Sequence, residues 1–192
     1  MPGGDWYWEY LRWCRIERCP MMKTVFPPNA NGFAPLETIW VSDLLMAHCI
    51  WSIGYSRGAH SSFRKLRQLH LRNCPRLCFV LPVWASSFLS LETLHVIHFS
   101  DLPCIFVPDG EYAKQITVKG VTFPKLATIH LHNLMMLQQI CYAILRELPT
   151  VAACGPKPSV QIEKDVWDAL EWDGVEAGHH PSLFKKPIYS LY

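Results

Sequence analysis

The sequence predicts an α/β repeat fold, a solenoid with a parallel β-sheet on its concave face and irregular or helical segments on its convex face. Two observations support this prediction. One apolar pattern recurs in five windows of the chain. Half of the 192 residues are hydrophobic and only 18% are charged, which supplies a core and excludes intrinsic disorder. The length fits one domain or one elongated repeat array.

The five windows align on a leucine in each, which we use as the anchor: Leu11, Leu36, Leu66, Leu91 and Leu126. An aromatic residue stands three positions before every anchor, and apolar residues stand three, five, eight, eleven and fourteen positions after it. The shared pattern is L-x-x-L-x-L-x-x-(C/L/F)-x-x-L, which is typical of leucine-rich repeats. The sequence therefore predicts a short leucine-rich-repeat horseshoe.

Each repeat is expected to begin with a short strand, because its x-L-x-L-x stretch alternates apolar and polar residues. The first such strand presents Trp13, Arg15 and Glu17 outward. The later apolar sites follow helical rather than strand spacing, and Asn133–Leu148 is amphipathic enough for a helix on the outer side. Two longer intervals between anchors predict exposed loops around Gly54–Ser62 and Val107–Thr122.

The repeats are expected to occupy residues 1–150, and residues 151–192 to form a C-terminal capping segment. An open solenoid end exposes both core and strand edge, so the last repeat needs a cover. Trp167 and Trp172 are the predicted structural cap.

The outward positions of the five predicted strands give the candidate binding surface. Adjacent strands lie ~4.8 Å apart, so equivalent positions should form columns across the sheet. One column is expected to contain Arg15, Trp40, His70, His95 and His130. The full set of predicted partner-binding residues is Trp13, Arg15, Trp40, Gln68, His70, Arg72, His95, His130 and His132. Exposed aromatic and arginine side chains are typical of protein interfaces.

Other interpretations of these residues remain open. A histidine ladder can bind a metal or respond to pH near 6.5, although a polar contact surface needs neither. Basic residues concentrate between Leu44 and Leu91 and acidic ones between Gln161 and Gly178. This asymmetry fits an acidic partner over the middle repeats, or a solvated face and a charged cap.

The cysteines invite a zinc site, but their positions favour the core. Cys14, Cys19 and Cys74 occupy columns that hold leucine, isoleucine or phenylalanine in other repeats. A buried free cysteine behaves as a small hydrophobe. We therefore predict no metal.

The sequence offers no candidate catalytic residues and no cofactor. It contains no phosphate-binding loop, dinucleotide fingerprint, zinc-protease motif or nucleophile elbow. The small net charge of +2 and the absence of a known module argue against nucleic-acid binding. The sequence shows neither a signal peptide nor a membrane span, so we expect a cytoplasmic protein with reduced cysteines.

Two stretches, FRKLRQLHLRNCPRL and FPKLATIHLHNLMML, resemble the C-terminal repeats of plant intracellular disease-resistance receptors, the NB-ARC leucine-rich-repeat proteins. The tail VWDALEWDGVEAGHHPSLF looks like the terminal segment of a cereal-type subgroup. The resemblance implies plant defence: recognition of a pathogen effector or guarded host protein, and autoinhibitory contact with a nucleotide-binding module. That module's motifs do not occur in these residues, so the resemblance does not extend to nucleotide binding.

Two alternatives to the receptor remain. One is a leucine-rich-repeat substrate adaptor of a ubiquitin ligase, which would carry an F-box-like helical segment before the repeats. The other is an inactive truncated receptor fragment.

Overall fold

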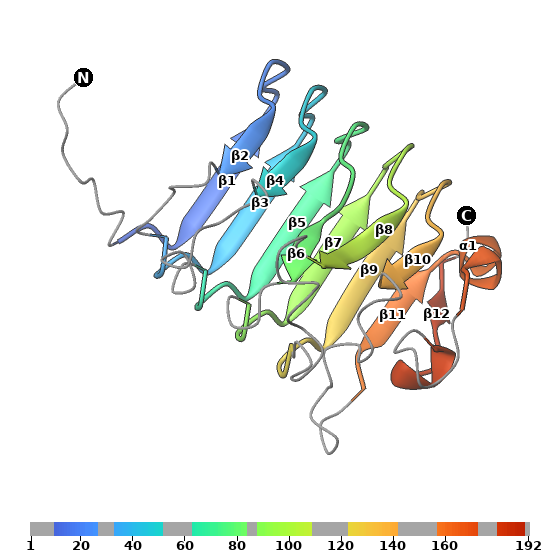
Figure 1. Cartoon of the computed structure of the whole chain (residues 1–192). Helices are drawn as coiled ribbons and strands as arrows, with labels where there is room; N and C mark the ends of the chain where they lie inside the picture. The colour runs from blue at the N-terminus through green and yellow to red at the C-terminus, as the bar shows by residue number, and fades with distance from the viewer. Residues whose placement is uncertain are drawn as a thin grey trace, which may run out of the picture.

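The computed structural model describes residues 10–26, 33–51, 63–83, 88–108, 123–141, 157–172 and 180–190. The chain winds as a parallel-strand solenoid, with the strands stacked side by side (Figure 1). Within these ranges the main sheet has seven strands: β1 (Trp13–Glu17), β3 (Thr38–Ser42), β5 (Gln68–Arg72), β7 (Thr93–Ile97), β9 (Thr128–His132), β11 (Ser159–Ile162) and β12 (Ile188–Tyr189). The predicted strands and solenoid repeat are confirmed.

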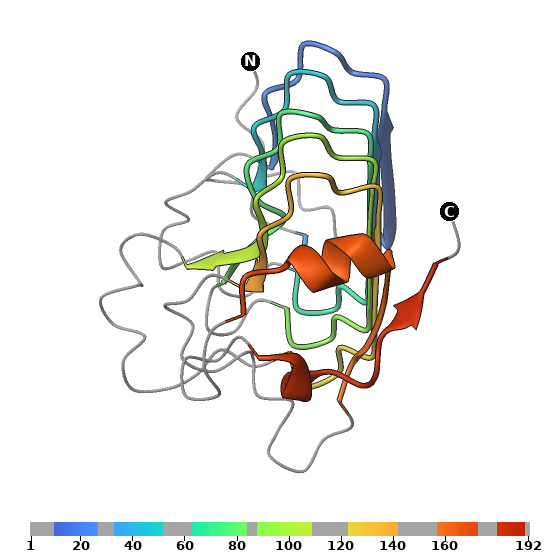
Figure 2. The ribbon, with the colours of Figure 1, turned by 90° about the vertical axis from the view of Figure 1, so that its right-hand side faces the viewer.

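Short parallel strands form the opposite wall of the solenoid. β2 (Thr24–Phe26) pairs with β4 (Cys49–Trp51). β8 (Cys104–Pro108) lies between β6 (Leu81–Val83) and β10 (Gln139–Cys141). Figure 2 shows that the loops leading from the main-sheet strands to this wall repeat one shape, each displaced from the loop before it.

Tight turns explain the three-residue spacing that suggested helices. The Leu77 amide donates to the Cys74 carbonyl at 3.1 Å, and the Leu137 amide donates to the Leu134 carbonyl at 3.2 Å. Each turn points two apolar residues three positions apart into the core, and an extended segment follows. The helix expected over Asn133–Leu148 is therefore wrong for residues 133–141, which form a turn and β10. Residues 142–148 lie outside the described part.

A second turn precedes each strand and places the aromatic residue inside. The anchor amides donate to the carbonyls of the aromatic residues three positions earlier at 3.0–3.1 Å, in the pairs Leu36–Phe33, Leu66–Phe63, Leu91–Phe88 and Leu126–Phe123. The first aromatic, Trp8, lies outside the described residues, as do Gly54–Ser62 and most of Val107–Thr122. Val107 and Pro108 belong to β8.

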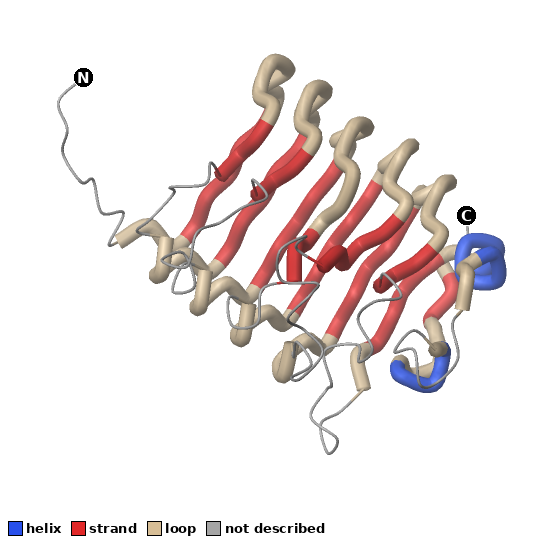
Figure 3. The backbone as a smooth tube through the Cα atoms, viewed as in Figure 1, coloured by secondary structure: helices blue, strands red, loops and turns tan. Residues whose placement is uncertain are grey.

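A left-handed residue follows each of the first five repeat strands. Positive φ angles of 50–62° recur seven positions after each anchor, at Arg18, Asp43, Asn73, His98 and Asn133. Aspartate and asparagine tolerate this region better than most residues. The amide of Asp43 donates to the Arg72 carbonyl at 3.1 Å, and other positions repeat this bond to the next strand. The resulting loops lie in a row along one edge of the main sheet (Figure 3).

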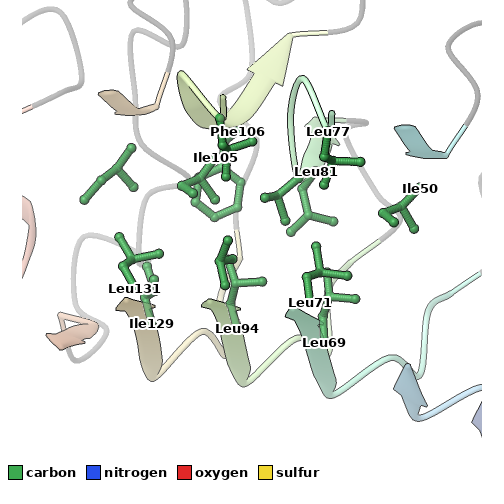
Figure 4. Packing of buried hydrophobic residues seen from close by; sticks show 14 of the residues in the cluster. Ile50, Leu69, Leu71, Leu77, Leu81, Leu94, Ile105, Phe106, Ile129 and Leu131 are labelled. Atoms are coloured by element: carbon green, nitrogen blue, oxygen red, sulfur yellow. The ribbon is translucent and has the colours of Figure 1, made fainter. Parts of the chain in front are cut away.

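The core lies between the main sheet and the opposite wall. Leu69, Leu71 and Leu94 project from the sheet toward Leu81 and Phe106 on the other side (Figure 4). The aromatic residues before the strands also stack: the ring centroids of Phe33 and Phe63, Phe63 and Phe88, and Phe88 and Phe123 lie 5.8, 6.2 and 6.4 Å apart. These contacts link neighbouring repeats from the second to the fifth.

The C-terminal segment continues the sheet before it covers the end. β11 pairs with β9, and β12 pairs with β11. The helix α1 (Lys164–Ala169) lies across the end of the stack (Figure 2), and a 3-10 turn follows at Pro181–Leu183. The sheet thus runs across the predicted boundary at residue 150.

Candidate functional site

The predicted column across the exposed face of the main sheet is confirmed. Strand register pairs Arg15 with Trp40, Trp40 with His70, His70 with His95, and His95 with His130. The same column continues to Gln161 on β11. We call Arg15, Trp40, His70, His95 and His130 the ring column.

The rings in this column stack on one another. The centroids of Trp40 and His70 lie 4.8 Å apart, those of His70 and His95 4.4 Å, and those of His95 and His130 4.1 Å. The interplanar angles are 19–29°. Strand spacing of ~4.8 Å brings flat side chains at one repeat position into this geometry. The column is therefore a continuous, ordered π surface.

An arginine and a partly buried hydrogen bond hold the first end of the ring column. The Arg15 guanidinium lies 5.7 Å from the Trp40 ring centroid, a cation–π distance, and its Nη2 lies 2.6 Å from Glu17 Oε1. Ser42 Oγ, on a largely buried residue, donates to the same carboxylate oxygen at 3.1 Å. The Arg15 hydrogen bond is the main reason that the pKa of Glu17 lies below its ordinary value.

Two histidines of the column, His70 and His95, are neutral at pH 7. Partial burial, with a smaller contribution from His130, lowers the pKa of His70. Burial and then the neighbouring His130 and His70 lower the pKa of His95 to about 4. His130 Nδ1 lies 2.7 Å from Gln161 Oε1, a hydrogen bond that orients its ring. Neutral imidazoles can stack without the repulsion that charged ones would suffer.

The remaining predicted residues flank the ring column. Trp13, 53% exposed, and the exposed Gln68 lie on the side where the strands begin. Arg72 and His132 lie on the side where the strands end. All nine predicted residues are thus on one face, and their role in binding a partner stays a prediction.

His132 belongs to a partly buried acidic contact that sequence reasoning missed. Its Nδ1 contacts Glu163 Oε1, and the Asn133 amide donates to that oxygen at 2.8 Å. Within the described part of the chain, the buried Glu163 Oε2 has no hydrogen-bond partner. Glu163 comes directly after Val160 and Ile162, whose alternation indicates a further strand. The five-repeat pattern does not include this strand, so it does not predict Glu163.

A groove of about 700 Å³ runs along the carboxyl-terminal ends of the strands. Its lining includes Arg15 and Trp40 from the ring column and Arg72 from the flank. It also includes residues of the left-handed loops that sequence reasoning missed: Arg18, Asp43, Asn73, His98 and Asn133. The recurrence of aspartate and asparagine seven positions after the anchors was the signal available for them.

A smaller cavity of about 230 Å³ lies at the other end of the face. His95, His130 and His132 line it together with Gln161 and Ser190. Ligand pockets for small molecules usually span ~300–1,000 Å³. The cavity is therefore too small for a typical cofactor.

The described cysteines are free thiols, and the repeat columns account for three of the six. Cys74 is fully buried, and Cys14 and Cys19 pack against the core, as predicted. Burial raises the pKa values of Cys74 and Cys104 to about 11. Both are therefore protonated at neutral pH, which disfavours nucleophilic attack and metal binding. Among the described residues, no group of three or more histidine, cysteine or acidic side chains has a geometry that could hold a metal ion.

The predicted cap residues lie together at the end of the core. Trp167 is 8% exposed, and its ring centroid lies 4.7 Å from that of Trp172 and 5.9 Å from that of Phe184. This aromatic cluster packs against the core, as expected of a cover for the last repeat.

Comparisons of the chain with protein-family models, with curated proteins and with solved structures found no match. In the described residues, no helix is long and apolar enough to cross a membrane.

Proposed function

We propose that this chain is a protein-interaction module of the leucine-rich-repeat type, belonging to a plant intracellular immune receptor, and that it binds its partner through the exposed face of the main sheet. The ring column is the observation on which this proposal mainly rests. Tryptophan and arginine dominate the energetics of protein interfaces, and here they stand in one line with stacked histidines.

Order in the free protein favours binding by this surface. Each ring is held between its neighbours, so its side chain loses little conformational entropy when a partner docks. Immobilising a mobile side chain otherwise costs ~0.5–1.5 kcal/mol. Lowered pKa values keep His70 and His95 neutral at pH 7, so their desolvation costs less than that of charged groups.

One local feature supports the leucine-rich-repeat type. Cysteine occurs at the plus-eight position, which accepts asparagine or cysteine in that repeat class. The thiols of Cys19 and Cys74 donate to the carbonyls of Glu17 and Arg72, each at 3.4 Å. A polar group at this position thus bonds the end of its own strand, which leucine could not do.

The receptor context rests on the resemblance of the repeats and the tail. It implies two partners: a pathogen effector or guarded host protein, and the nucleotide-binding module of the parent receptor. Both would use the exposed face of the main sheet. We propose the second partner as the first to test, because it requires no knowledge of the pathogen.

The test is co-expression of the chain with a nucleotide-binding module from a cereal receptor, scored by pull-down and by suppression of that module's activity. We expect association that is weakened at least tenfold by W40A combined with H70A. The matched control is H48A with R76A, two exposed residues away from the main sheet. Equal association of both double variants, with unchanged circular dichroism, would place the contact elsewhere.

A further inference from the structure

The groove along the strand ends has a polarity that defines the chemistry of its occupant. Arginines lie at the β1–β5 end, where Arg15, Arg18 and Arg72 contribute to the lining. Met135, 81% exposed, lies at the β9 end. The groove thus offers cations at one end and an apolar contact at the other.

The acidic residues of the groove are already engaged. Glu17 contacts Arg15 and accepts a hydrogen bond from Ser42. Asp43 Oδ1 accepts from Asn73 Nδ2 at 2.6 Å. Arg18 and Arg72 are exposed, and neither has a carboxylate at ion-pair distance among the described residues. Two arginines therefore remain available for an incoming anionic group.

The spacing of these groups follows from the repeat. Arg18 comes from the β1 end, Arg72 from the β5 end and Met135 from the loop after β9, so each step spans two strand intervals. Two intervals correspond to ~10 Å at ~4.8 Å each. A chain extended in the polyproline II conformation covers about that distance in three residues, at ~3.1 Å each, and brings every third side chain to the same side. An extended peptide across the strand ends would therefore meet these residues at a spacing of three.

We propose that this groove binds an extended acidic segment of the partner protein, with two acidic residues three positions apart and an apolar residue three positions further on. This proposal deepens the proposed function and rests on it. Arg18 and Arg72 each take one carboxylate, in the planar two-bond geometry that arginine forms with carboxylates. The apolar side chain packs on Met135, whose flexible thioether adapts to varied partners.

The test uses fluorescence anisotropy with the labelled peptide Glu-Ser-Thr-Glu-Ser-Thr-Leu and the whole chain at low ionic strength. Two further peptides keep the length: one replaces both Glu with Gln, and one scrambles the order to Glu-Glu-Leu-Ser-Thr-Ser-Thr. We expect the first peptide to bind at least tenfold more tightly than either of the others.

Variants of the chain locate the contact. R18Q and R72Q should each weaken binding about tenfold, as expected for loss of a charge-assisted hydrogen bond. R64Q is the matched control, because it removes the same charge from an exposed residue in the turn before β5, at the opposite end of the strands. Melting curves identify any variant that fails to fold. Arg18 is exposed and outside the strands, so R18Q remains informative if R72Q unfolds.

Three results with these peptides and variants would overturn the proposal. They are no binding of the first peptide, equal binding of the scrambled peptide, and an equal loss with R64Q, since the last two indicate attraction by net charge alone. Displacement by an equal concentration of single-stranded oligonucleotide would also overturn it.

If the nucleotide-binding module associates normally while the peptide does not bind, only this inference fails. If the first peptide binds more tightly than the scrambled one but no module associates, the assignment to an immune receptor fails. The inference that the groove binds an acidic peptide is then still supported.

Discussion

The imidazole rings of His95 and His130 stack across neighbouring strands, with centroids 4.1 Å apart and planes inclined by 22°. Protonation of both would place two positive charges at that distance in a half-buried setting. Burial and this neighbour lower the pKa of His95 to about 4, from an ordinary value of 6.5. The unfolded chain therefore takes up a proton near pH 6.5, and the folded chain only near pH 4. Acidification through this window favours unfolding.

We predict that the midpoint temperature of thermal unfolding decreases as the pH is lowered from 6.5 to 4. His95→Phe should make this decrease smaller. Phenylalanine keeps a flat ring in the column but cannot be protonated. Thermal unfolding followed by circular dichroism at several pH values measures the effect. His48→Asn, at an exposed position away from the main sheet, should leave the decline unchanged. Parallel pH curves for wild type and His95→Phe would show that the column does not couple folding to pH.

The stacked phenylalanines give a prediction about stability. Phe88 is 2% exposed, and its centroid lies 6.2 Å from that of Phe63 and 5.4 Å from that of Trp51. Phe88→Ala should lower the free energy of unfolding by about 3–5 kcal/mol, because it leaves a cavity between two repeats. The neighbouring Leu89, which is 38% exposed, provides the control substitution Leu89→Ala. Urea unfolding measures both, and a loss below about 1 kcal/mol for Phe88→Ala would contradict tight packing there.

The C-terminal segment should be required for solubility. Deleting residues 158–192 removes β11 and the aromatic cluster around Trp167, so the β9 edge and the end of the core meet water. Exposed edges and apolar ends promote association, and we expect aggregation on size-exclusion chromatography. A truncated chain that stays monomeric and melts cooperatively would refute this role.

A milder variant separates packing from loss of the strand. Trp167→Ala keeps β11 and should cost about 3 kcal/mol of unfolding free energy. Lys164→Ala, on the same helix but exposed, is its control. Equal stability of the two variants would mean that the tryptophan does not close the stack.

Thiol reactivity should follow burial. Cys78 is exposed, whereas the buried Cys74 and Cys104 have pKa values raised to about 11. We predict that iodoacetamide at pH 8 labels Cys78 in the native chain, and labels Cys74 and Cys104 only after urea is added. Peptide mass mapping over time distinguishes the sites. Rapid native labelling of Cys74 would indicate that the repeat opens locally.

Much of the main sheet follows from the sequence because two simple periods coincide there. Alternation along a strand assigns Leu69 inward and His70 outward, and a constant offset from the anchor aligns His70 with His95. No other information is needed to predict a column. The sequence does not establish that this column binds a partner, because the same outward residues can occur on a surface that binds nothing.

The turns, the last strands and the groove were less predictable. Leu134, Leu137 and Ile140 are spaced like residues on one face of a helix, but a turn followed by a strand points them inward equally well. Val160 and Ile162 form only a short alternating segment without an aromatic residue before it, so the sequence pattern assigns β11 to the capping segment. The groove depends on backbone conformation after the strands, where Arg18 and His98 adopt positive φ against their usual preference.

The left-handed loops have a consequence for how such a chain can change over evolution. In the first four of these loops the amide of the left-handed residue donates to a backbone carbonyl of the next strand, so those connections depend on backbone atoms rather than on the identity of outward side chains. In the fifth loop the Asn133 amide donates to the Glu163 carboxylate instead. Replacing an outward residue, or duplicating one repeat, would add or alter one step of the exposed surface without disturbing the joint. Variation in what the surface recognises is thereby uncoupled from the interactions that keep the protein folded.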